Sequence, residues 1–209
     1  MRKTLLAAAA IAAMTLGVGT AKATTVGDPV GDFRPSFIGP FTSDLDVTSF
    51  TVDLDRVANA FDLSATFAGP LDTSKANLYV IGVNTGTGVI QPFADIGEPK
   101  VIFNQALIVH ENGVVTLGAN TLSPAIIAGN GFSLVVPTSA FTSTGFAPRD
   151  FQFNLWPRTA LTNNNQISDF APQNATIAAL PEPAAWALMI GGFGLAGARL
   201  RARRRVQPA

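Results

Sequence analysis

Residues 24–180 consist of short runs in which apolar and polar side chains alternate with a period of two. In residues 48–54 the apolar side chains fall on one face and the polar side chains on the other, and residues 61–67 repeat the pattern. Period two is typical of a half-buried β-strand. No stretch of helical period occurs in this region, so the sequence predicts an all-β fold.

The number and spacing of these runs narrow the fold class. Continuously apolar runs at 77–83 and 101–109 are typical of central strands. Shorter runs follow at 114–117, 132–136 and 151–155, and Asn112-Gly113 predicts a type I′ hairpin turn. Strands separated by Gly, Pro, Asn and Asp predict one antiparallel β-sandwich over residues 24–172, of jelly-roll or immunoglobulin-like type.

Composition excludes several classes of site. The chain has no Cys and one His, which excludes disulfides, thiol chemistry and multi-His metal centres. Thirteen of the fourteen Asp and Glu residues lie in 24–180, against six of the fourteen Lys and Arg residues. An acidic middle argues against nucleic acid as a partner, because nucleic-acid binding needs a basic surface.

The first 23 residues have the pattern of a secretory signal peptide. Met1-Arg2-Lys3 precedes an apolar run over residues 5–18, and Ala21-Lys22-Ala23 has the small-residue spacing of a cleavage site. We expect export by the general secretion machinery and cleavage by signal peptidase after Ala23. The alternative is an uncleaved membrane anchor.

The C-terminal segment has the pattern of a membrane signal. Pro181, Glu182 and Pro183 precede an uncharged run over 183–198 that contains Trp186. As a helix this run would be about 24 Å long, which Leu200 and snorkelling arginines would extend toward a bilayer core of about 30 Å. The basic cluster after it comprises Arg199, Arg201, Arg203, Arg204 and Arg205. The positive-inside rule places this cluster in the cytoplasm, and we expect residues 173–180 to form a linker.

Residues 181–205 resemble the PEP-CTERM sorting signal of exosortase-containing Gram-negative bacteria, in the variant with Pro-Glu-Pro, Trp-Ala, a Gly-Phe-Gly core and an arginine-rich end. The resemblance implies that exosortase, a cysteine protease of the inner membrane, recognises Pro181, Glu182, Pro183, Trp186 and the arginines and removes the tail. It further implies inner-membrane anchoring before processing, delivery to the cell surface or extracellular matrix, and association with exopolysaccharide and biofilm. The alternative is a simple anchor without processing.

A second resemblance concerns the start of the middle region. Asp28-Pro29-Val30-Gly31-Asp32 and Asp44-Leu45-Asp46-Val47 resemble the first strands of DOMON-like and family 9 carbohydrate-binding modules. Those modules are β-sandwiches that bind sugars, haem or calcium. The middle region has one His and no Met, so the haem ligands of that family are lacking here.

Two candidate binding sites follow from the residue types. Asp28, Asp32, Asp44 and Asp46 could supply oxygen ligands to a structural calcium ion, or could simply cap turns. Tyr79 and Trp156 could stack on a sugar whose hydroxyls bond Asn163, Asn164 and Asn165, or could belong to the core. We expect no other cofactor.

The sequence predicts no catalytic residue. His110 lies before Glu111-Asn112-Gly113, no Gly-x-Ser-x-Gly motif is present, and nothing singles out a carboxylate pair. We therefore expect an exported, non-enzymatic surface or matrix protein. A carbohydrate-binding module is the first alternative, and a secreted glycan hydrolase is the second.

Overall fold

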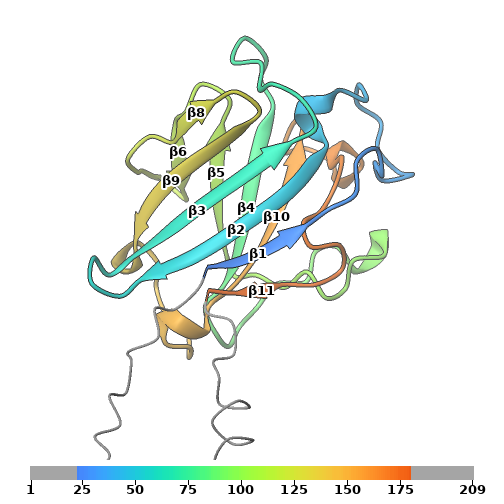
Figure 1. Ribbon diagram of the computed structural model, residues 1–209. Helices are drawn as coiled ribbons and strands as arrows, with labels where there is room; N and C mark the ends of the chain where they lie inside the picture. Colours follow the sequence, from blue (N-terminus) through green and yellow to red (C-terminus); the bar gives the residue numbers. More distant parts are fainter. Residues whose placement is uncertain (1–22, 180–209) are drawn as a thin grey trace, which may run out of the picture.

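The computed structural model describes residues 23–179, and these residues form an all-β domain of two antiparallel sheets packed face to face (Figure 1). Sheet A has the strand order β1 (Thr24–Gly27), β2 (Val47–Asp55), β3 (Ala60–Phe67), β9 (Gly131–Pro137) and β8 (Ile126–Ala128). Sheet B has the order β11 (Ile177–Ala178), β10 (Gln152–Arg158), β4 (Leu78–Asn84), β5 (Gln105–His110), β6 (Val115–Leu117) and β7 (Asn120–Thr121). The helical turns in the described part are 3-10 helices: η1 (Ser43–Leu45), η2 (Ala94–Ile96), η3 (Thr138–Ala140), η4 (Pro148–Asp150) and η5 (Asn164–Gln166).

The main core lies between the two sheets and follows the period-two pattern. In β2 the side chains of Phe50, Val52 and Leu54 are buried, whereas Thr51 and Asp53 face outward. Successive side chains of a strand point to opposite faces of its sheet, so one face of β2 builds the core. The prediction of two packed, mainly alternating strands at 48–54 and 61–67 is confirmed.

A second apolar cluster covers the outer face of sheet B. It contains Leu78, Val80, Phe93, Val101, Trp156, Ile167 and Phe170. Because apolar residues cover both of its faces, β4 is buried along its whole length. This confirms the prediction of a central strand there. The run at 101–109 becomes a strand only at Gln105, and Val101 instead belongs to this second cluster.

The turn between β5 and β6 differs from the predicted type I′ turn. Gly113 has a positive φ of 84°, but Asn112 does not, whereas a type I′ turn needs positive φ at both central residues. The Gly113 N–H donates to the His110 carbonyl and the His110 N–H to the Val114 carbonyl, both at 2.8 Å. The hairpin is present, but its loop has three residues and ends in a left-handed glycine.

The expected linker at 173–180 also differs, because its described part is packed on the domain. β11 pairs with β10, and Ala179 is fully buried. The Asn154 side chain donates to the carbonyls of Pro172 and Ala175 at 2.6 and 2.8 Å. The folded unit therefore extends to Ala179, seven residues beyond the expected boundary at 172. β1 and β11 lie side by side, so the two ends of the described chain are at the same end of the molecule (Figure 1).

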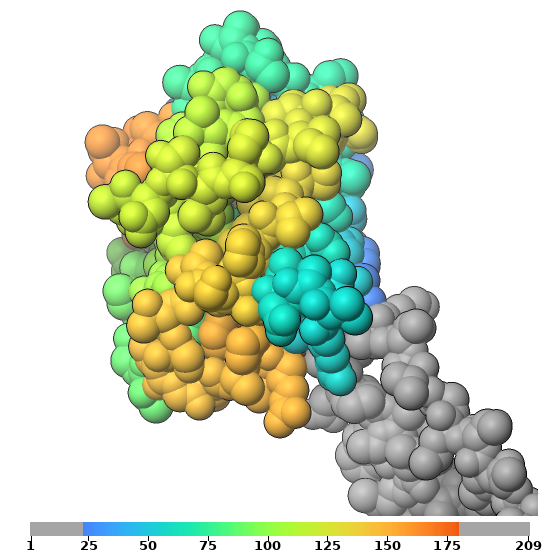
Figure 2. Space-filling model, turned by 90° about the vertical axis from the view of Figure 1, so that its left-hand side faces the viewer, coloured from blue at the N-terminus to red at the C-terminus, as the bar shows by residue number. Residues whose placement is uncertain are grey.

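The β2–β3 turn lies against the segment that follows β9. The two segments are adjacent on the face shown in Figure 2, in cyan and gold. The Thr138 N–H donates to the Asn59 carbonyl at 2.9 Å, and Asn59 has a positive φ of 52°. This contact continues the β3–β9 pairing past the end of the two strands.

Candidate functional site

Four aspartates meet where the β1–β2 connection contacts the segment between β10 and β11. Asp28, Asp32 and Asp169 each offer a carboxylate oxygen within 4.8 Å of the other two. Asp46 lies beside them, and its Oδ2 accepts the Gly31 N–H at 2.8 Å. We call these four residues the Asp cluster. It joins the first part of the folded chain to the last.

Backbone hydrogen bonds hold the Asp cluster in place. The two carboxylate oxygens of Asp169 accept the N–H groups of Val47 at 3.1 Å and Phe170 at 2.7 Å. The Asp28 N–H donates to the Thr48 carbonyl at 2.9 Å, and the Ser168 hydroxyl donates to the Leu45 carbonyl at 2.7 Å. The start of β2 is therefore fastened on one side to β1 and on the other to residues 168–169.

The cluster brings carboxyl groups together without a basic partner. Burial, followed by the charge of Asp32, raises the pKa of Asp28, and burial followed by the charge of Asp28 raises the pKa of Asp169. Burial also raises the pKa of Asp46. No ion pair within residues 23–179 includes any of the four. Oxygen-only groups of this kind are the ligands that hard divalent cations prefer.

Three of the four predicted calcium ligands belong to this cluster, but Asp44 does not. Asp44 lies in η1, where its Oδ2 accepts Lys75 Nζ at 3.1 Å and Asn77 Nδ2 at 3.0 Å. The sequence-based set is therefore corrected at this position. Asp169 takes the fourth place, and no local signal in the sequence linked it to Asp28 or Asp46.

The aromatic residues proposed for sugar stacking are buried. Tyr79 packs between the sheets against Phe67 and Phe132, with ring centroids 4.7 and 5.6 Å apart. Trp156 lies on the opposite face of sheet B, in the second apolar cluster. Neither ring offers a face to a ligand from solvent, so of the two alternatives for these residues the structure favours the core over sugar stacking.

The three asparagines expected beside these rings form a turn. The Asn163 side chain accepts the Asn165 N–H at 2.8 Å and forms a capping box with Gln166 at the start of η5. Asn164 Nδ2 donates to the Pro92 carbonyl at 3.3 Å. Within this turn, the side chains of Asn163 and Asn164 are used for local structure.

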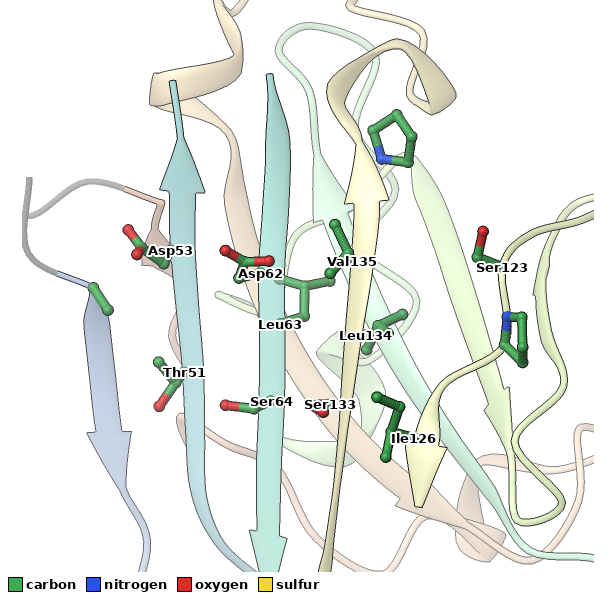
Figure 3. A pocket seen from close by; sticks show the side chains of 13 residues that line it. Thr51, Asp53, Asp62, Leu63, Ser64, Ser123, Ile126, Ser133, Leu134 and Val135 are labelled. Carbon is green, nitrogen blue, oxygen red and sulfur yellow. The ribbon is translucent and has the colours of Figure 1, made fainter. Parts of the chain in front are cut away.

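A groove that the sequence did not indicate lies on the outer face of sheet A (Figure 3). Its volume is about 700 Å³, and its lining includes Thr51 and Asp53 of β2, Asp62 and Ser64 of β3, and Ile126 of β8. Asp53 and Asp62 are directly opposite in the strand register. Partial burial and the charge of Asp53 raise the pKa of Asp62. The groove thus combines hydroxyls, two carboxylates and an apolar rim.

The residues expected to direct sorting and cleavage lie outside residues 23–179, except Ala23, which borders the groove. Within the described residues, no helix is long and apolar enough to cross a membrane. Comparison with protein-family models, with curated proteins and with solved structures found no match to this chain. The functional interpretation therefore depends on the chain's own residues.

Proposed function

We propose that this chain is an exported, non-enzymatic protein of the cell surface or extracellular matrix that is sorted through residues 181–205 and processed by exosortase. We further propose that it acts in association with exopolysaccharide. The support is the order of Pro-Glu-Pro, an uncharged run and an arginine cluster in the sequence, which resembles the PEP-CTERM signal.

The observation that carries this proposal is the position of the motif in the sequence relative to the described domain. β11 finishes at Ala178 and Ala179 is buried, and Pro181 follows two residues later. A membrane protease needs a substrate segment that is not part of a packed core. The described residues of the domain end at Ala179, and the motif follows them in the sequence from Pro181.

The construction of the domain is consistent with export. The chain contains no Cys, and its main core draws on both sheets. A domain of this size can bury enough apolar surface to be stable without disulfides. Such a domain has no thiol that an oxidising compartment would alter.

We also propose that the sandwich is of the jelly-roll type. β3 pairs with β9 in sheet A, and β4 pairs with β10 in sheet B. The chain crosses between the sheets three times, from β3 to β4, from β7 to β8 and from β9 to β10, and the first and third crossings run together as a folded antiparallel ribbon. Ribbons of this kind favour a jelly roll over an immunoglobulin-like arrangement.

The decisive experiment is intact-mass and C-terminal analysis of the full chain made in hosts with and without exosortase. We expect a species that starts at Thr24 and ends near residues 181–183 only when exosortase is present. Substitution of Glu182→Ala should abolish this processing, whereas Glu98→Ala, inside the domain, tests whether loss of folding alone has the same effect. A membrane species that keeps Arg199 in both hosts would overturn the proposal.

Carbohydrate binding is the second candidate function, and the groove on sheet A is the observation that favours it. Hydroxyl and carboxylate groups can bond sugar hydroxyls, and Ile126 and Val135 offer apolar contact. Affinity electrophoresis of the full chain in gels containing the host's polysaccharide tests this candidate. Retardation that Ser64→Trp abolishes would support it, because the larger side chain fills the groove, and equal mobility with and without polysaccharide would exclude it.

A secreted glycan hydrolase remains the third hypothesis, with Asp53 and Asp62 as the carboxylate pair that the groove presents. Hydrolysis would require two carboxylates on opposite sides of a glycosidic bond. Release of reducing ends from the same polysaccharide, lost on Asp62→Asn, would support this activity.

A further inference from the structure

We propose that Asp28, Asp32 and Asp169 each supply a carboxylate oxygen to one calcium ion, with Asp46 beside them, and that the bound ion fastens residues 28–46 to the segment between β10 and β11. This inference does not depend on sorting, on exosortase or on polysaccharide. It states which ion the Asp cluster binds and how the bound ion stabilises the fold.

The spacing of the oxygens suits one calcium ion. Calcium binds carboxylate oxygens at about 2.3–2.6 Å, so two oxygens on opposite sides of one ion are at most about 5 Å apart. One carboxylate oxygen from each of Asp28, Asp32 and Asp169 lies within 4.8 Å of the corresponding oxygens of the other two. All three can therefore bind the same ion without rearrangement of the backbone.

Asp46 provides a second, independent indication of a ligand. Its side chain is buried, at 3% exposure, and only Oδ2 has a hydrogen-bond partner. Oδ1 is buried with no partner, and the charge of Asp32 acts on this carboxyl group. A buried unpaired carboxylate oxygen costs several times more than a typical hydrogen bond contributes, unless a cation or water meets it.

Two neighbouring aspartates also have carboxylate oxygens without hydrogen-bond partners. Asp28 Oδ2 and Asp32 Oδ1 are also buried without a hydrogen-bond partner. The nearest arginine in sequence, Arg34, is engaged elsewhere, because its guanidinium group pairs with Glu98 and bonds the Ile96 carbonyl. A divalent cation held by Asp28, Asp32 and Asp169 would offset the carboxylate charge of these residues and of Asp46 beside them.

The donor set selects calcium over softer metals. All four side chains offer oxygen, and zinc or copper sites generally include nitrogen or sulfur ligands. Calcium accepts six to eight oxygens in flexible geometry, so waters, carbonyls or the neighbouring Asp46 can complete a set of three carboxylates. Calcium is also present at millimolar concentration outside cells, where sites of modest affinity are occupied.

The ligands come from distant parts of the chain, which defines the effect of binding. Asp28, Asp32 and Asp46 lie within the β1–β2 connection, and Asp169 follows β10. Calcium would stabilise the folded chain by binding only when both segments are in place. For a site with a dissociation constant of about 1 mM, 10 mM calcium should raise the melting temperature by about 3–6 °C.

The test uses the full chain, purified in a non-ionic detergent and freed of metal with a chelating resin. Isothermal titration with calcium chloride should show one site per chain, and thermal unfolding should shift upward with calcium and return on addition of EDTA. Asp32→Asn and Asp46→Asn should each weaken binding by at least about tenfold. Asp95→Asn, which removes the same charge from an exposed residue of η2, is the matched control and should bind as the unsubstituted chain does.

Two results would overturn the proposal. The first is no calcium heat together with equal melting temperatures in calcium and in EDTA. The second is undiminished binding in the aspartate variants, which would place the ion elsewhere. If Asp46→Asn fails to fold, Asp32→Asn still tests whether the cluster binds calcium. Asp32 is partly exposed, and its side chain accepts no backbone hydrogen bond in the structure.

Discussion

The indole ring of Trp156 lies directly over Gly82 of the neighbouring strand. A Cβ atom on Gly82 would come within 2.5 Å of two carbons of that ring and within 3.1 Å of the Phe103 Cβ. The absence of a side chain at residue 82 is what lets the second apolar cluster close over sheet B.

Substitution of Gly82→Ala should therefore destabilise the domain by about 1–3 kcal/mol, because the buried Trp156 ring must move. Thermal and urea unfolding of the full chain measure the loss. Gly27→Ala is the control, since no atom lies within 4 Å of its added Cβ and it lies at the end of an edge strand. Equal losses at residues 27 and 82 would show that the close approach to Trp156 has no energetic consequence.

The ion pair between Arg34 and Glu98 is buried, with side chains 9% and 5% exposed. The Arg34 guanidinium also lies 5.1 Å from the centre of the Phe170 ring. Glu98→Gln should cost about 3 kcal/mol in free energy of unfolding, because it leaves a buried cation without its counter-charge. Urea unfolding measures this loss.

The exposed pair Arg149–Asp150 is the matched control for that measurement. Asp150→Asn should change the free energy of unfolding by less than about 0.5 kcal/mol, because solvent screens exposed pairs. Similar losses for the two substitutions would contradict the expectation that burial decides their effect.

Glu111 is buried at 1% exposure, and neither carboxylate oxygen has a hydrogen-bond partner. Burial raises the pKa of this carboxyl group, with the Asp44 charge adding to the effect. Since the folded pKa lies above the unfolded one, the stabilising contribution is complete at low pH and is lost as pH rises through the folded pKa.

Glu111→Gln removes this titration and should be more stable than the unsubstituted chain at pH 7, by about 1 kcal/mol. The advantage should shrink toward pH 4, where the glutamate is protonated in the folded chain. Melting temperatures of both proteins between pH 4 and pH 8 provide the measurement. A constant difference across this range would show that Glu111 does not titrate as described.

Asp53 and Asp62 are opposite one another on β2 and β3, at the groove. Like charges in this position are destabilising, so Asp62→Asn should raise the free energy of unfolding by about 0.5 kcal/mol at low salt. The gain should diminish in 1 M salt, where the screening length falls to about 3 Å. Asp95→Asn should show no such salt-dependent gain, and a decrease in stability for Asp62→Asn would refute the repulsion.

Local alternation in the sequence predicted the longer strands well, as β2, β3 and β9 show. Each lies within one residue of the predicted run at both ends. The strands that the sequence missed are β1, β7, β8 and β11, which have two to four residues each. Runs so short carry too little periodicity to be recognised, and their partners in the sheet decide whether they form.

The candidate sites depend more strongly on contacts between distant residues. Asp44 and Asp46 are two residues apart in sequence, yet Asp44 pairs with Lys75 and Asn77, whereas Asp46 belongs to the Asp cluster. Asp44 lies within η1 and Asp46 is the residue that caps its C-terminal end, so this turn separates the two side chains. Only the approach of the segment after β10 brings Asp169 to Asp28.

Tyr79 and Trp156 illustrate the same limit for apolar side chains. Their residue types suit either a core or a sugar platform. Phe93, Val101, Ile167 and Phe170 come from the connections between strands and cover Trp156 on the outer face of sheet B. The periodicity of a strand does not predict which of the segments between strands will cover its outer face.

The sequence by itself determined that the domain is all-β, which faces of its longer strands are apolar, and which metal-binding chemistries are excluded, because these properties depend on residue type and on spacing of a few positions. The tertiary structure alone decided which aspartates converge, where the groove lies and which aromatic rings are buried. Those outcomes depend on the pairing of strands that are far apart in the chain, and that pairing minimises exposed apolar surface over the whole domain rather than over any segment.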